Sequence, residues 1–233
     1  VGGGAPTRPP SGAAVWEAWT VAAELPAQIA PRQLDQQHFA MELGCTDPPF
    51  CPGAVSTGTQ VFQLDTALLD VAVDLSDDVV LADPPDVAAM RAPYPQPAAQ
   101  AAPTVQRGSL FGGDTFTHGS LLSDQMAWWG GGITDGRGTY PAPANEDPAV
   151  ARAIHRLADS GRADARRYAV VRSPSNFDQE HPGQTALESL AVASSGGQPE
   201  GESLALQNVY LAARALTDAI VGDWDAWEDG VRR

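Results

Sequence analysis

The segment from Val87 to Gln106, VAAMRAPYPQPAAQAAPTVQ, constrains the fold most, because four prolines interrupt it among alanine and glutamine. Proline lacks a backbone N–H and fixes its own φ, so no continuous helix can run through this segment. Chain of this composition favours an extended, polyproline-like path. We therefore predict a linker or surface belt at residues 87–107, between an N-terminal unit at 13–86 and a C-terminal unit at 108–233.

The N-terminal unit is predicted to begin with helices. Residues 1–12 are rich in Gly, Pro and Ser and indicate a flexible arm. Apolar residues at helical spacing predict a helix over 13–25, and a proline at the start with a glycine at the end predicts a second helix over 31–44. Both helices are expected to pack their apolar sides inward.

Residues 59–82 change character and are predicted to form a β-hairpin. Val71, Val73 and Leu75 alternate with smaller or polar residues, and a Ser-Asp-Asp turn at 76–78 separates them from a second apolar run. The alternative is a helix covering Thr66–Val73, because short apolar runs do not discriminate between the two structures.

The C-terminal unit is predicted to start with loops and end with helices. Glycines interrupt the aromatic residues between 108 and 145, which indicates a loop-rich region. Asp147 and Pro148 predict the start of a helix that ends at Gly161, and apolar residues every three or four positions predict one long amphipathic helix over 202–228. The fold class is therefore α+β, with helices near both ends around a loop-rich, partly β centre.

The composition excludes some partners. The formal net charge of −15 repels the phosphates of nucleic acid, and no apolar run approaches the roughly 20 residues of a membrane helix. All 14 basic residues are arginine, and the chain contains no lysine. A GC-rich genome and adaptation to high salt both account for this bias, and the acidic surface fits a halophilic protein.

The two cysteines, Cys45 and Cys51, enclose five residues that include two prolines. We predict a structural disulfide between them, with reduced thiols as the alternative. Including His38 gives a spacing that matches none of the common zinc sites. Because the sequence also begins with Val rather than Met, we expect a processed chain in an extracytoplasmic or virion-associated location.

The loop GGDTFTHGSLLSD at 112–124 gathers residue types that a Ser/His/Asp hydrolase uses. Asp114, His118 and Ser120 are the candidate catalytic residues. Ser120 does not lie in the G-x-S-x-G pattern that places a nucleophile on a sharp turn. The main interpretation is therefore an ordinary hydrogen-bonded loop, with secreted hydrolase activity as the alternative.

Seven aspartates lie between 65 and 86, and Ca²⁺ binds oxygen ligands of this kind. The run lacks an EF-hand pattern, so a solvated acidic face is the main interpretation and no cofactor is expected. The alternative is a Ca²⁺ site that uses Asp70, Asp74, Asp77 and Asp78.

The only basic concentration lies between 146 and 172, where an arginine-rich stretch opposes the acidic remainder of the chain. It can pair within the chain, with another subunit or with an anionic ligand. Trp128 and Trp129 can fill the core or a partner's groove. The predicted partner-binding residues are Arg152, Arg156, Arg162, Arg166, Arg167, Trp128 and Trp129.

We found no motif that assigns a chemical reaction to this chain. The flexible arm, the Pro/Ala segment and the arginine-rich stretch therefore favour a non-catalytic structural or accessory subunit of a larger extracellular, envelope or virion assembly. Its expected partners are other protein subunits, including copies of itself, with no nucleic acid and no membrane span. The alternatives are the secreted hydrolase and a carbohydrate- or Ca²⁺-binding module.

Overall fold

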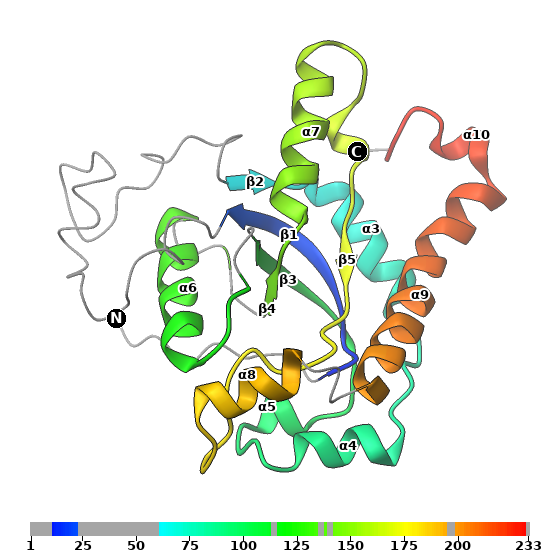
Figure 1. Cartoon of the computed structure of the whole chain (residues 1–233). Helices are drawn as coiled ribbons and strands as arrows, with labels where there is room; N and C mark the ends of the chain where they lie inside the picture. The colour runs from blue at the N-terminus through cyan, green and yellow to red at the C-terminus, as the bar shows by residue number, and fades with distance from the viewer. Residues whose placement is uncertain are drawn as a thin grey trace, which may run out of the picture.

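A central sheet with helices around it forms the described part of the molecule (Figure 1). The computed structural model describes residues 11–22, 61–112, 116–134, 138, 142–194 and 199–231. The strands in these ranges are β1 (Ala14–Ala22), β2 (Val61–Gln63), β3 (Val105–Gly112), β4 (Ala142–Ala144) and β5 (Val171–Arg172). The helices are α3 (Thr66–Ser76), α4 (Pro85–Arg91), α5 (Pro97–Gln100), α6 (Ser120–Ile133), α7 (Asp147–Asp159), α8 (Ala186–Ser194), α9 (Pro199–Gly222) and α10 (Trp224–Trp227), with a 3₁₀ turn at Ala165–Arg167. The predicted α+β class is confirmed.

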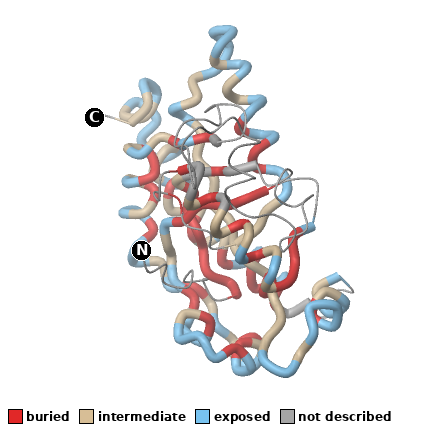
Figure 2. Tube along the Cα trace, turned by 90° about the vertical axis from the view of Figure 1, so that its left-hand side faces the viewer, coloured by how far each residue is buried: buried red, intermediate tan, exposed pale blue. Residues whose placement is uncertain are grey.

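Strand β1 is the centre of the sheet, whose order is β2-β1-β3-β4 with β5 also paired to β1. β1 runs parallel to β3 and antiparallel to β2 and β5, and β3 runs parallel to β4. The register between β1 and β3 shifts between Glu17 and Trp19, which marks a bulge. Figure 2 shows buried residues concentrated along these central strands and exposed residues on the outer helices.

The two faces of β1 meet different helices. Trp16 packs with Leu68, Leu69 and Ala72 of α3 and with Leu216 of α9. The opposite face, which carries the next residue along the strand, meets α7. Side chains alternate across a strand, so neighbours in the sequence enter different environments.

Strand β1 replaces the helix predicted over 13–25. The apolar spacing of this segment fits a helix, but pairing with three other strands decides its conformation. The predicted hairpin in 59–82 is also wrong: α3 covers Thr66–Ser76, as the helical alternative proposed. Asp65 caps this helix, since its carboxylate accepts a hydrogen bond of 3.0 Å from Leu68 N.

The Pro/Ala segment forms two short helices rather than extended chain. α4 and α5 each have a proline in the first turn, where the missing N–H costs no helical hydrogen bond. β3 begins at Val105, inside the same segment, and pairs with β1. The division of the chain at 87–107 into two units stays a prediction.

Helix α6 occupies a region that was predicted to be loop. Its glycines allow it to lie against the sheet: a Cβ on Gly130 would lie 1.6 Å from Cζ of Phe111. This close approach explains why glycine occurs inside a helix here, despite its low helix propensity.

The two C-terminal helix predictions are confirmed, with corrections. α7 runs from Asp147 to Asp159, but Glu146 rather than Asp147 occupies the N-cap position. The long helix ends at Gly222, and α10 follows as a separate short helix. The predicted helix at 31–44 and the Cys45–Cys51 pair lie outside the described residues.

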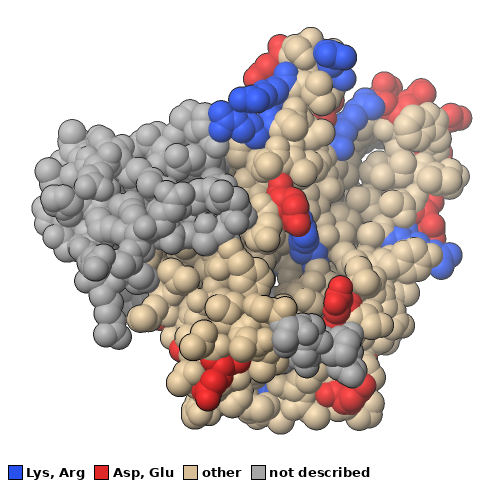
Figure 3. All heavy atoms as spheres, viewed as in Figure 1, with Lys and Arg blue, Asp and Glu red and all other residues tan. Residues whose placement is uncertain are grey.

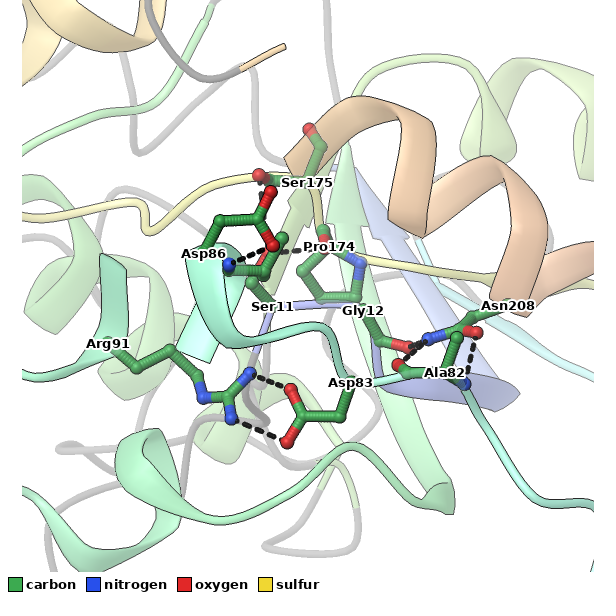
Figure 4. A network of polar contacts seen from close by, with 10 residues as sticks. Ser11, Gly12, Ala82, Asp83, Asp86, Arg91, Pro174, Ser175 and Asn208 are labelled. Carbon is green, nitrogen blue, oxygen red and sulfur yellow. Dashed lines mark hydrogen bonds and ion pairs between the residues drawn. The ribbon is translucent and has the colours of Figure 1, made fainter. Parts of the chain in front are cut away.

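Asn208 of α9 joins three segments that lie far apart in the sequence (Figure 4). Its amide nitrogen donates to Gly12 O (2.8 Å) and Ala82 O (3.0 Å), and its oxygen accepts from Ala82 N (2.9 Å). Nearby, the guanidinium of Arg91, 3% exposed, makes a bidentate ion pair with Asp83. The buried amide of Asn208 is thus satisfied where the start of β1 meets α9.

Candidate functional site

A cavity of about 200 Å³ opens beside the sheet, where β1, β3 and β4 meet the segment that follows β5. We call it the cleft. Figure 3 shows a hollow near the middle of this face, beside a place where acidic and basic side chains meet. The cleft is lined by Val15, Leu110, Phe116, Thr117, Ala142, Pro143, Ala144, Arg172, Ser173, Pro174, Ser175, Asn176 and Asp178.

The segment 173–178 supplies most of the polar groups of the cleft. The backbone carbonyl of Pro174 accepts a hydrogen bond of 2.8 Å from Gly12 N, and the hydroxyl of Ser11 lies 3.3 Å from Ser175 O (Figure 4). A Cβ on Gly201 would lie 2.3 Å from that same Ser175 oxygen, so α9 packs closely against the segment. These contacts hold the backbone of the segment in place from two sides.

The far end of the segment is fixed by α6 and by Tyr94, which lies between α4 and α5. The Ser123 hydroxyl donates to the Asp178 carboxylate at 2.6 Å, and the Ser120 hydroxyl donates to Glu180 at 2.6 Å. The Tyr94 ring stacks on Phe177 with the ring centres 3.7 Å apart, and its hydroxyl donates to Gln179 O. Burial raises the pKa of Tyr94 to about 12, so the phenol stays a donor at neutral pH.

At the other end of the cleft, Arg172 of the lining forms ion pairs with two carboxylates. Arg172 donates from Nε (3.1 Å) and Nη2 (2.6 Å) to Oδ1 of Asp147, and Nη2 also donates to Glu146 at 2.6 Å. The hydrogen bond from Arg172 lowers the pKa of Glu146, and the two carboxylates raise that of Arg172 despite its partial burial. Glu17, 1% exposed, lies against Asp147.

The candidate hydrolase residues have separate partners. The ring of His118 is buried and its Nε2 lies 2.9 Å from Ser189 Oγ, whereas Ser120 bonds to Glu180. Burial lowers the pKa of His118, although the carboxylates of Asp178 and Glu180 oppose this effect. Asp114 lies outside the described residues. A catalytic role for these three residues stays an untested prediction.

The acidic run lies along α3 and the residues after it. Asp70 pairs with Arg107 of β3, and Asp74, Asp77 and Asp78 are exposed. Among the described residues, no group of three or more His, Cys, Asp or Glu side chains is arranged to hold a metal ion. The Ca²⁺ alternative therefore stays a prediction without a site in this part of the chain.

The arginine-rich stretch is distributed over several elements. Arg152 and Arg156 lie on α7, exposed like Arg162, while Arg166 and Arg167 both pair with Asp164. Arg166 lowers the pKa of Asp164 to about 2. Trp128 is half-buried on α6, and the side chain of Trp129 is outside the described set.

The polar lining of the cleft was not predicted from the sequence. The run Ser173-Pro-Ser-Asn-Phe-Asp178 directly follows a short strand, and short polar residues after a strand are a recognisable signal of a binding loop. Glu17 gave no such signal, because the carboxyl group that it meets, that of Asp147, lies 130 positions further along the sequence.

A cleft that combines apolar walls with a few hydroxyl, amide and charged groups is the kind of site that proteins use for small molecules. The sequence profile of the family described as "Purine nucleoside permease (NUP)" matches residues 1–232. The chain belongs to this family.

Two fungal relatives match over much of the chain. A purine nucleoside permease of Candida albicans is 33% identical over 183 residues, which cover 78% of this chain and 44% of the relative. A probable purine nucleoside permease of Schizosaccharomyces pombe is 28% identical over 204 residues, covering 88% and 58%. The chain thus spans roughly half the length of these relatives.

Among solved structures, a 5′-methylthioadenosine/S-adenosylhomocysteine nucleosidase from Neisseria meningitidis is similar with a TM-score of 0.47 and 16% identity, covering 93% of this chain and 66% of that one. The corresponding nucleosidase from Helicobacter pylori gives a TM-score of 0.43 and 11% identity, covering 92% and 62%.

Family membership corrects the functional prediction. The expected structural or accessory subunit of an extracellular, envelope or virion assembly is wrong, because the family and both relatives are named for purine nucleoside permeases. The same finding contradicts the extracytoplasmic or virion-associated location, the expected subunit partners and the expected lack of a membrane span. Within the described residues, no helix has both the length and the apolar composition to cross a bilayer.

Proposed function

We propose that the chain binds purine nucleosides in the cleft, as the nucleoside-recognition part of a permease. The observation that carries the proposal is the polar segment 173–178, held rigidly against apolar walls in a chain of this family. A nucleoside joins a flat aromatic base to a sugar rich in hydroxyl groups, so it needs both kinds of surface.

The lining offers a partner for each half of such a ligand. Phe116 is 52% exposed at the cleft, and its ring presents an aromatic face on which a base can stack. The buried hydroxyl of Ser173 has no hydrogen-bond partner among the described residues, and Arg172 is part of the same lining. An unpaired buried hydroxyl is costly, and a bound ribose would satisfy it.

Isothermal titration calorimetry of the chain with adenosine, guanosine and uridine tests this function. We expect the two purine nucleosides to bind and uridine to bind more weakly, because the smaller ring offers less stacking area. Phe116→Ala should weaken adenosine binding by about 1–3 kcal/mol, roughly 5- to 150-fold. Leu187→Ala is the control, since Leu187 is 75% exposed on α8 and is not part of the cleft lining.

The nucleosides are recovered after titration and checked by chromatography, so that any heat from chemical conversion is recognised. A folded chain that binds neither purine nucleoside at millimolar concentration contradicts the proposal. Equal weakening by Phe116→Ala and Leu187→Ala would move the binding site away from the cleft.

A further inference from the structure

Glu17 is a buried acid with no donor to stabilise a negative charge. Among the described residues, neither of its carboxyl oxygens has a hydrogen-bond donor, and Oδ2 of Asp147 lacks one as well. A hydrogen-bond interaction with the carboxyl group of Asp147 is among the causes that raise the pKa of Glu17, so the two groups lie close together. Such a hydrogen bond requires a proton between them, because two carboxylates are both acceptors.

The proton belongs on Glu17. Asp147 already accepts two charge-assisted hydrogen bonds from Arg172 through Oδ1, which favours its charged form. A second negative charge beside it would share a single arginine in a buried place, at a high cost in free energy. Burial, followed by the charge of Asp147, raises the pKa of Glu17 to about 9, although Arg172 opposes the shift.

Other charged groups around β1 do not replace this proton. The phenol of Tyr168 lies near Glu17, and burial together with the charges of Glu17 and Asp147 raises its pKa, so it stays neutral. Glu146 forms an ion pair with Arg172. The remaining groups have other contacts: the ring of His155 on α7 packs on Phe62 of β2, and Arg107 of β3 pairs with Asp70 of α3.

We propose that protonated Glu17 and ionised Asp147 form a proton-sharing pair that positions Arg172 at the cleft. Glu17 donates to Asp147 Oδ2, which leaves Oδ1 to hold the guanidinium of Arg172. Arg172 is part of the cleft lining, and its backbone lies opposite Val15 in the register of β5 against β1. Both acids are positioning residues, since neither is part of the cleft lining. This inference rests on the proposed function, because a nucleoside is the molecule that Arg172 would meet.

Loss of the proton changes the position of Arg172. Ionised Glu17 would attract the guanidinium away from Glu146 and from the cleft, so nucleoside affinity should fall as the pH rises through about 9. If only the protonated form binds, the dissociation constant increases about tenfold between pH 8 and pH 10. Adenosine is the suitable probe, because its base does not lose a proton in this range.

Glu17→Gln and Glu17→Leu separate a positioning role from a merely structural one. Glutamine keeps a donor for Asp147 and cannot titrate, so its affinity should equal that of the wild type at pH 7 and stay constant to pH 10. Leucine removes the donor and should weaken binding at every pH. Tyr168→Phe is the matched control, since it removes the neighbouring phenol and should keep the pH profile of the wild type.

Infrared difference spectroscopy tests the pair without a ligand. The wild-type spectrum at pH 7 should contain the carbonyl band of a protonated carboxylic acid, absent from Glu17→Gln and lost from the wild type above pH 10. A missing band, or a Glu17→Gln variant that keeps the wild-type pH profile, overturns the inference. If adenosine binds to no variant but the band is present, the proposed function fails and the proton-sharing pair stands.

Discussion

Trp16 and Glu17 are neighbours in β1, but they lie on opposite faces of the sheet and meet opposite kinds of surroundings. Trp16 is enclosed by α3 and α9, and its indole N–H donates to Ser76 Oγ at 2.9 Å. Glu17 is equally buried, yet it meets a carboxylate and receives no donor from the described residues. One face is satisfied by packing, and the other keeps electrostatic strain next to the cleft. Such strain is typical of functional sites.

The largest effect is expected on the packed face. Trp16→Ala should lower the free energy of unfolding by about 3–5 kcal/mol, because it leaves a cavity among Leu68, Leu69 and Leu216. Denaturant unfolding followed by circular dichroism measures this loss. A loss below about 1 kcal/mol would show that α3 and α9 do not depend on this face.

The next effect is a pH dependence of stability, which we expect from Glu17 on one face of β1 and not from Trp16 on the other. The pKa of Glu17 is about 9 in the folded chain against an ordinary value of 4.5. The folded state therefore binds more protons between these values, so this contribution to stability is complete below pH 4.5 and is lost as the pH rises through 9. The limiting slope is about 1.4 kcal/mol per pH unit.

Glu17→Gln should remove that slope. Between pH 5 and pH 8.5, the free energy of unfolding of Glu17→Gln should increase relative to that of the wild type. The free energy of unfolding of Trp16→Ala should change with pH in the same way as that of the wild type. Urea unfolding at several pH values makes the comparison. Parallel curves for Glu17→Gln and the wild type would mean that Glu17 is ionised in the folded chain.

Close packing of α9 against the cleft predicts a smaller effect. Gly201→Ala places a Cβ 2.3 Å from Ser175 O and should cost about 1–3 kcal/mol of stability and weaken adenosine binding, because segment 173–178 must move. Gly222→Ala on the same helix meets no atom within 4 Å and should be neutral or stabilising by up to about 1 kcal/mol. Calorimetry and thermal unfolding of both variants test the contrast; equal behaviour would contradict it.

The smallest effect concerns a polar contact of the packed face. Ser76→Ala leaves the indole N–H of Trp16 without its acceptor and should cost about 1 kcal/mol, with adenosine affinity unchanged. Ser76 lies on α3, away from the cleft, so a change in affinity would show that the two faces of β1 are coupled. Denaturant unfolding and titration of the same sample decide this.

Local patterns predicted those elements whose hydrogen bonds lie within one segment. The apolar spacing identified α7 and α9, a proline at the start supported α7, and α3 was the alternative to the hairpin. The buried side of α9 was identified only in part. Leu216 is buried as its spacing indicates, but Leu206 is 65% exposed, and the polar Asn208 is fully buried with its amide satisfied by Gly12 and Ala82. The apolar periodicity of a segment indicates that it forms a helix, but the elements packed against that helix decide which of its sides is buried.

The sequence by itself determined the α+β class and the helical C-terminal part, because helices obey short-range rules of spacing and capping. Only the tertiary structure decided that the segment after Ala13 is a strand, since its partners β2, β3 and β5 lie about 40 to 150 residues away. The tertiary structure also forms the cleft and brings Glu17 next to Asp147. Burial and the pKa shift of a carboxyl group arise from its neighbours in space, which its neighbours in the sequence do not reveal.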